Sequence, residues 1–206
     1  MKQNMRKRSP LAVLLALCLA MQLCVPAAMA SNRLMRAGDA AIAQIEEEEG
    51  FRAEKYSSGG KWYIGYGTEC GAEDYPEGIT REEAELLLMS KVEAYEAKLN
   101  DFFDRYDVTP TQGQFDALIC FSYNFGTGWM SGTSDLVKIA RGEKDATRLE
   151  VAHAFGEWCH SGGQAQAGLA DRRLQEAAIY LDDSTRAAEN EFAYLIINME
   201  SGTSYE

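Results

Sequence analysis

A short glycine-rich segment near the start of the chain most constrains how it can fold. Gly59 and Gly60 stand between Tyr56-Ser57-Ser58 and Lys61-Trp62-Tyr63, two runs with the aromatic residues typical of strands. Two adjacent glycines readily adopt the positive φ angles that a two-residue hairpin turn requires. The segment therefore predicts an antiparallel hairpin in which Tyr56 pairs with Tyr63, Ser57 with Trp62 and Ser58 with Lys61.

Side chains alternate between the two faces of such a hairpin. One face would carry a set of polar and aromatic groups, namely Tyr56, Ser58, Lys61 and Tyr63, and the other would carry Trp62, Ile64 and Tyr66. Further along, Gly65 and Gly67 would present bare backbone, against which a flat sugar ring could lie. An ordinary small hairpin whose glycines only serve turns is an equally good interpretation.

A helix is predicted over residues 37–49, directly before the hairpin. Glu49 falls on the same stripe as Met35, Ile42 and Ile45, whereas the preceding glutamates at 46–48 fall nearer the solvated face. A carboxyl group on an apolar stripe keeps its proton more readily than a solvated one, which suits a general acid. Gly50 fits the position that closes the helix. The alternative is a solvated, acidic helix end.

The remainder of the chain is predicted to be mostly helical. Two capping boxes, Thr80 to Glu83 and Thr111 to Gln114, open helices that should end near Leu99 and at Asn124-Phe125-Gly126. Shorter helices are predicted over 134–141, 147–158 and 169–181, and a polar loop over 69–78. These patterns predict an α+β domain, mostly helical, with one small antiparallel sheet near its start.

The first thirty residues have the pattern of a secretory signal. Basic residues precede an apolar core over 11–23, and the small residues that end at Ala30 predict cleavage there. The core is short for a membrane span, and neither Cys18 nor Cys24 follows a small residue as lipid attachment requires, so we expect no stable membrane anchor. An uncleaved anchor is the alternative. We therefore expect an exported monomer with one domain over 31–183.

Acidic residues outnumber basic ones, and the formal net charge is −12. Cleavage after Ala30 would remove four of the 20 basic residues and none of the 32 acidic ones, which gives −16 for the mature chain. Such a charge argues against a nucleic-acid partner. The polar tail over 184–206 contains an apolar run, 192–197, that reads as a lone strand: either an added edge of the domain or the start of a module that is missing here.

Three cysteines follow the predicted signal, and their spacing excludes a CxxC metal or redox motif. Cys120 stands in an apolar run and should be a small buried residue. Cys70 follows the hairpin and Cys159 precedes a glycine loop, so both could meet near a groove, and in an exported protein we predict a disulfide between them. No metal site or cofactor motif is visible, and His153 should be structural.

Several motifs, taken in order, resemble the phage-type lysozymes, the muramidase family of phage endolysins and their bacterial relatives. They are Glu49-Gly50-Phe51, the strand from Trp62 to Gly67, the stretch from Thr111 to Leu118, Asn124-Phe125-Gly126, Trp158, and Gly168-Leu169 with Arg172-Arg173 and Glu176. Ordered agreement from about residue 37 to 182 is more specific than any single motif. With Cys70 and Cys159, the motifs resemble a secreted branch found in Gram-positive bacteria.

The resemblance implies a lysozyme fold, no cofactor, and hydrolysis of the β-1,4 bond between N-acetylmuramic acid and N-acetylglucosamine in peptidoglycan. Glu49 takes the position of the general acid. The second and third catalytic positions, usually an aspartate and a threonine, fall on Ser58 and Tyr63. The residues expected to contact the glycan strand are Tyr56, Gly65, Gly67, Thr68, Tyr123, Trp158 and Arg172. For Tyr123 and Trp158 core packing is the alternative role, and for Arg172 an ion pair with Glu176.

The residues at positions 58 and 63 depart from the family pattern. A glycosidase needs a second carboxylate to activate water or to act as nucleophile, and a serine hydroxyl is a poor base. Four acidic residues nearby in the sequence could substitute: Glu54, Glu69, Glu73 and Asp74. The main alternative function is a non-catalytic peptidoglycan-binding protein that kept the groove, and a third is an exported scaffold module.

Overall fold

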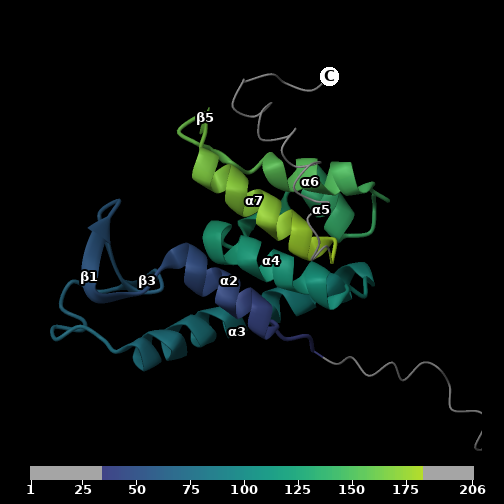
Figure 1. The fold of residues 1–206 in the computed structure, drawn as a ribbon. Coiled ribbons are helices and arrows are strands. Elements are labelled where there is room, and N and C mark those ends of the chain that lie inside the picture. Colours follow the sequence, from purple (N-terminus) through teal and green to yellow (C-terminus); the bar gives the residue numbers. More distant parts are fainter. Residues whose placement is uncertain (1–33, 183–206) are drawn as a thin grey trace, which may run out of the picture. The chain divides into compact units, whose positions relative to one another are not determined.

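A computed structural model of the chain describes residues 34–182 (Figure 1). The predicted signal over 1–30 and the predicted strand over 192–197 lie outside the described residues. In chain order the elements are α2 (Asp39–Glu49), β1 (Arg52–Ser58), β2 (Lys61–Gly65), β3 (Thr68–Cys70), α3 (Arg81–Tyr106), α4 (Gln112–Phe125), the 3-10 turn η1 (Gly128–Ser131), α5 (Asp135–Ala140), α6 (Arg148–Gly156), β4 (His160–Ser161), β5 (Gln164–Ala165) and α7 (Ala167–Tyr180). Within this described part, no helix is both long and apolar enough to cross a membrane.

The predicted hairpin is confirmed, including its register. Tyr56 pairs with Tyr63, Ser57 with Trp62 and Ser58 with Lys61. Gly59 and Gly60 form the turn with φ angles of 58° and 80°, as the two-residue turn requires. A third strand, β3, pairs antiparallel with β2. It occupies the start of the segment predicted as a polar loop, so the sheet has one strand more than the sequence indicated.

The sheet is held to the helices through its apolar face. Ile64 and Tyr66 are buried in the core, and Gly65 between them has a φ of 61°. A Cβ at Gly65 would lie only 3.0 Å from the Cβ of Ala84 on α3. The prediction that Gly65 offers bare backbone to a sugar is therefore wrong, because the first turns of α3 cover this position.

Both predicted capping boxes are formed. Thr80 and Glu83 cap α3, and Thr111 and Gln114 cap α4 in the same reciprocal way. Helix α3 runs to Tyr106, well beyond the predicted end, because Phe102 and Phe103 continue its buried stripe. The shorter predicted helices correspond to α5, α6 and α7, while the small β4–β5 hairpin before α7 was not predicted.

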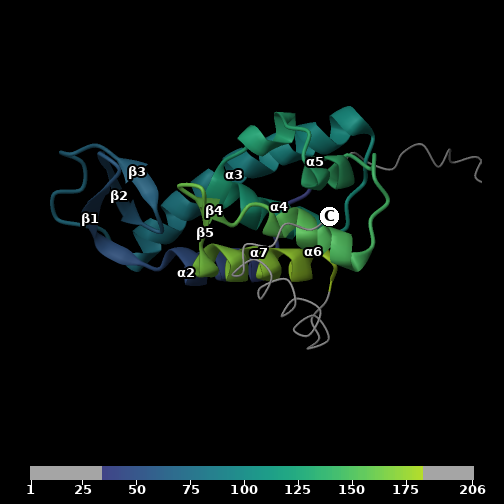
Figure 2. The same cartoon turned by 90° about the horizontal axis from the view of Figure 1, so that it is seen from above.

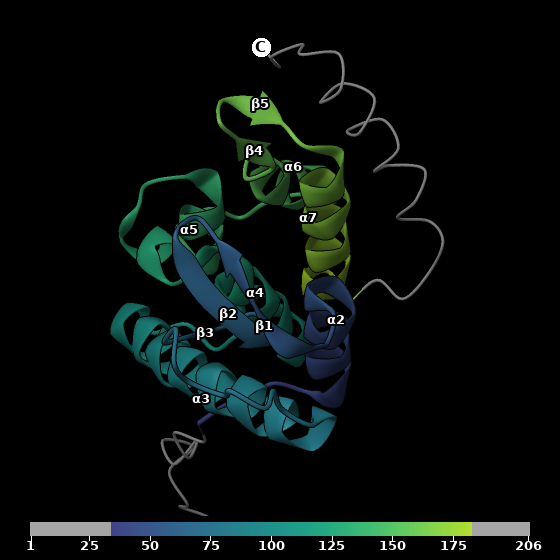
Figure 3. The ribbon, with the colours of Figure 1, turned by 90° about the vertical axis from the view of Figure 1, so that its left-hand side faces the viewer.

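Helix α4 forms the centre of the core. Every residue from Phe115 to Tyr123 is buried, and α4 packs against α2, α3 and α7, while α6 covers another side of α7. Figures 1 and 2 show the sheet at one end of α2 and the β4–β5 hairpin at the start of α7, with the remaining helices grouped around α4. Figure 3, viewed from the side of the sheet, shows α2 and α7 one above the other beside α4.

The contact between Gly65 and α3 can be tested with two alanine substitutions. Gly59 also has a positive φ, 58°, but a Cβ there would meet nothing within 4 Å. Both Gly59→Ala and Gly65→Ala should suffer the backbone strain, and Gly65→Ala should lose about 1–3 kcal/mol more stability because of overpacking. Chemical denaturation of the two variants measures the difference, and equal losses would contradict the packing described for Gly65.

Candidate functional site

Glu49 lies where α2, the sheet and α7 come together. Gly50, with φ 64° and ψ 142°, ends α2 and turns the chain into β1. The Glu49 side chain is 21% exposed, and its Oε1 accepts a hydrogen bond of 2.8 Å from Arg172 Nη1 on α7. Its Oε2 lies on the side of Gly67, 3.2 Å from where a Cβ would stand. The carboxyl is thus fixed on one side by a cation, and on the other it borders a residue without a side chain.

Arg172 belongs to a buried network of charges on α7. Glu176 is almost fully buried, and its Oε1 lies 2.7 Å from Arg173 Nη2 and 3.4 Å from Arg172 Nε. Arg173 also donates to Asn124 Oδ1 at the end of α4. Burial raises the pKa of the Glu176 carboxyl, and the two guanidinium groups oppose this rise. Arg172 therefore forms the ion pair with Glu176 that the sequence offered as its alternative role, and it also contacts Glu49.

Side chains of α3 and α4 form another wall beside Glu49. The Tyr123 hydroxyl donates to the Tyr66 carbonyl at 2.8 Å, and Lys91 Nζ lies 3.8 Å from the centre of the Tyr123 ring. Burial lowers the pKa of Lys91, while the charge of Glu49 raises it. Burial, followed by the charge of Glu49, raises the pKa of both Tyr95 and Tyr123. These three groups consequently lie within the electrostatic reach of Glu49.

Tyr123 and Trp158 both pack in the core, which is the role that the sequence offered as the alternative to contact with the glycan strand. Tyr123 is only 4% exposed, and Trp158 packs edge-on against Phe121 and Phe125.

The proximity of Lys91 to Glu49 was missed by sequence reasoning. The available signal was its place on α3, four residues before Tyr95, on the face that α4 covers.

The outer face of the sheet carries Ser58 and Tyr63, the residues predicted to occupy the second and third catalytic positions. Tyr56 and Tyr63 stack with their ring centres 5.7 Å apart, and Ser58 is exposed beside the turn. Strand pairing of Tyr63 with Glu69 adds a carboxylate to this face, and Glu69 forms an ion pair of 2.8 Å with Lys61. Thr68 pairs instead with Ile64, on the inner face of the sheet, and it is partly buried near Tyr123.

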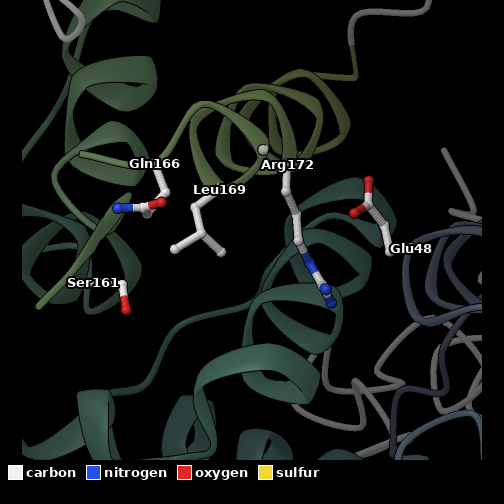
Figure 4. A pocket seen from close by; sticks show the side chains of 6 residues that line it. Glu48, Ser161, Gln166, Leu169 and Arg172 are labelled. Atoms are coloured by element: carbon white, nitrogen blue, oxygen red, sulfur yellow. The ribbon is translucent and has the colours of Figure 1, made fainter. Parts of the chain in front are cut away.

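An open, mostly polar cavity of about 620 Å³ is lined by Arg172, the residue that contacts Glu49. Its lining comes from the end of α2, from the β4–β5 hairpin and from the first turns of α7: Glu48, Ser161, Gln166, Gly168, Leu169 and Arg172. Figure 4 shows Arg172 extending between Leu169 and Glu48, with Gln166 and Ser161 on the far side of Leu169. The same arginine therefore lines the cavity and holds the carboxyl of Glu49.

The predicted disulfide is not formed in the structure, where Cys70, Cys120 and Cys159 are all free thiols. Cys70 is on β3, whereas Cys159 directly precedes β4, and Figure 1 shows the sheet and the β4–β5 hairpin well apart. A disulfide needs Cα atoms within about 7 Å of each other. Cys120 is buried on α4 as predicted. Among the described residues, no group of three or more His, Cys, Asp or Glu side chains could hold a metal ion.

Comparison with known proteins identifies the class. The phage lysozyme family model matches residues 46–176. An endolysin of Bacillus phage B103 is 33% identical over 165 residues, covering 76% of this chain and 58% of that protein. The chain thus spans little more than half the length of this relative. It belongs to the phage lysozyme family.

Solved structures agree with this assignment. The endolysin from Escherichia coli O157:H7 phage FAHEc1 is 32% identical, with a TM-score of 0.60 over 72% of this chain and 94% of its own. The muramidase domain of SpmX from Asticaccaulis excentricus is 28% identical, with a TM-score of 0.57 over 71% and 97%. The mostly helical α+β architecture predicted from the sequence is thus the lysozyme fold.

The ion network around Arg172 should contribute strongly to stability. Its side chain is 7% exposed and contacts two carboxylates, so Arg172→Met would remove the arginine partner of Glu49 and leave buried Glu176 with Arg173 alone. We expect a loss of about 3 kcal/mol or more in the free energy of unfolding. As a matched control, Lys61→Met removes an ion pair whose side chains are 58% and 55% exposed, and it should have a much smaller effect. Similar losses in the two variants would contradict a structural role for the network.

Proposed function

We propose that this chain is a lysozyme that hydrolyses the β-1,4 bond between N-acetylmuramic acid and N-acetylglucosamine in peptidoglycan, with Glu49 as the general acid. The observation that carries the proposal is the partly exposed carboxyl of Glu49, held by Arg172, which also lines an open cavity. Membership of the phage lysozyme family and the likeness to a muramidase domain support it.

The geometry suits proton donation to a leaving oxygen. Arg172 fixes Oε1 of Glu49 and so sets the orientation of the whole carboxyl group. Oε2 is left on the side of Gly67, where the missing side chain keeps the approach open. In the proposed reaction Oε2 carries the proton and transfers it to the glycosidic oxygen as the bond to the sugar breaks.

The cavity lined by Arg172 suits part of a glycan strand. Ser161 and Gln166 offer hydroxyl and amide groups, and Leu169 offers an apolar surface between them and Arg172 (Figure 4). Sugars with N-acetyl groups present the matching combination of hydrogen-bonding groups and a methyl group. A site of this type combines a few polar groups for orientation with apolar contact for affinity.

The test of the general acid is Glu49→Gln, which keeps the size of the side chain but cannot donate the proton. Release of reducing ends from purified peptidoglycan should fall by roughly two orders of magnitude or more, while sedimentation with cell-wall sacculi persists. Glu47→Gln is the matched control, because Glu47 is an exposed glutamate on the same helix; it should keep full activity.

Two other outcomes of this experiment would change the proposal. Undiminished hydrolysis by Glu49→Gln would remove Glu49 from the role of acid. A wild-type chain that sediments with sacculi but releases no reducing ends would instead be a peptidoglycan-binding protein, the alternative raised by Ser58 and Tyr63.

We also propose that the chain is exported, cleaved after Ala30, and acts as a monomer in the cell envelope or outside the cell. The support is the sequence pattern of residues 1–30. On expression in a secreting bacterium, the intact mass of the exported protein should correspond to residues 31–206. Replacing Ala28 and Ala30 by leucine removes the small residues before the cleavage point and should leave the chain uncleaved. An exported wild-type chain that retains residues 1–30 would refute this proposal.

A further inference from the structure

We propose that Glu69 supplies the second carboxylate of the reaction, as the base that activates water. This inference rests on the proposed hydrolase function. Ser58 and Tyr63 stand where the family places its second and third catalytic residues, and neither is an effective base at neutral pH. An acid-catalysed cleavage by Glu49 alone leaves the attacking water without a proton acceptor.

Strand pairing places Glu69 on the correct face. Directly opposed residues of an antiparallel pair point to the same side of the sheet, and Glu69 opposes Tyr63. Tyr63 in turn opposes Tyr56 on β1, and Ser58 opposes Lys61 on the same face. Glu69 is therefore on the face that carries both unusual positions, whereas its neighbours Thr68 and Cys70 are on the other.

The distance to Glu49 is compatible with an inverting mechanism. Oε2 of Glu49 lies 3.2 Å from the position of a Cβ at Gly67, and Glu69 is only two residues further along the chain. Two residues span at most roughly 7 Å, so the Cα of Glu69 lies within roughly 12 Å of that oxygen. This upper limit is compatible with the separation of about 6.5–9.5 Å between the two carboxyl groups that inverting enzymes use.

Lys61 holds the Glu69 side chain in place by an ion pair. Its ammonium group lies 2.8 Å from Oε2 of Glu69, and this hydrogen bond is the main reason why the pKa of Lys61 is raised. The ion pair thus joins a carboxylate with a protonated lysine and orients the carboxylate. More than half of each side chain remains exposed, so a water molecule can approach Glu69.

The other acidic residues near the hairpin lack this combination. Asp74 Oδ2 accepts a hydrogen bond from the Gly71 amide, 2.7 Å away, and is thereby tied to its own turn. Glu73 is exposed in the same loop. Glu54 is exposed on β1 within the segment where the pairing with β2 is irregular. Among the four candidates, only Glu69 is fixed on the outer face by regular strand pairing and a lysine partner.

The proposed step balances as a single displacement. Glu69 takes a proton from water, the water oxygen bonds to the anomeric carbon, and the bond from that carbon to the glycosidic oxygen breaks. Glu49 gives its proton to the departing oxygen, and both carboxyl groups then exchange protons with solvent. The new reducing end has the inverted, α configuration.

The test compares the wild-type chain with Glu69→Gln, using Glu54→Gln and Glu73→Gln as matched controls. Release of reducing ends should fall at least 100-fold in Glu69→Gln and remain unchanged in the two controls. Binding to sacculi and the melting temperature should be the same in all four proteins, because each replaced side chain is exposed.

A second variant separates a chemical role from a structural one. Azide attacks the anomeric carbon without losing a proton, so it needs no base. In Glu69→Ala, azide should restore cleavage and yield an α-glycosyl azide, and in Glu49→Ala it should not. Full activity of Glu69→Gln, or an inactive Glu69→Ala that azide does not rescue, would overturn the role of Glu69 and leave the proposed hydrolase function standing. A wild-type chain that releases no reducing ends would overturn both.

Discussion

The interaction on which the rest of the site depends is the contact of Arg172 with two carboxylates. One is Glu49, which is 123 residues away in the sequence, and the other is Glu176, one turn further along α7. A guanidinium group can serve both because it presents several donors in a fixed plane. These charged groups are buried or partly buried. Removing one of them therefore takes an ion-pair partner from a charge in the interior, which destabilises the fold. Because α7 packs against α4, Arg172 links the placement of α7 in the core to the position of Glu49.

The two sides of the site differ in how they are built. Around Glu49 the charged groups are buried or partly buried and are held by residues from α3, α4 and α7. On the sheet, the polar groups are exposed, and they are positioned only by strand pairing and by the Lys61–Glu69 ion pair. A proton donor benefits from a fixed orientation, whereas a group that activates water must remain accessible. The proposed roles of Glu49 and Glu69 match this difference.

Local patterns predicted the parts of the fold that local interactions determine. The Gly59-Gly60 turn specified the hairpin register, and the capping boxes at Thr80 and Thr111 specified two helix starts. Strands β3, β4 and β5 have only two or three residues, which is too short for alternation to be recognised. The same limit explains why the sequence could not single out Glu69 among four acidic candidates. Its pairing with Tyr63 and its ion pair with Lys61 distinguish it in the structure.

Contacts between distant segments could not be read from the sequence. Gly65 looked like open backbone because nothing near it in the chain indicates that Ala84 covers it. The disulfide was inferred from export and from loops that were expected to meet, whereas both cysteines are free thiols in the structure. The contact of Lys91 with the ring of Tyr123 likewise depends on the packing of α3 on α4.

The long separation between Glu49 and Arg172 has a consequence for biosynthesis. The acidic residue belongs to the first described helix and its arginine to the last, so a chain still emerging from a ribosome or a secretion channel contains one without the other. A nascent or truncated chain that ends before α7 cannot assemble this pair, whatever else has folded. The pair can form only once α7 has been synthesised, and the boundary to any module that follows must therefore lie beyond α7.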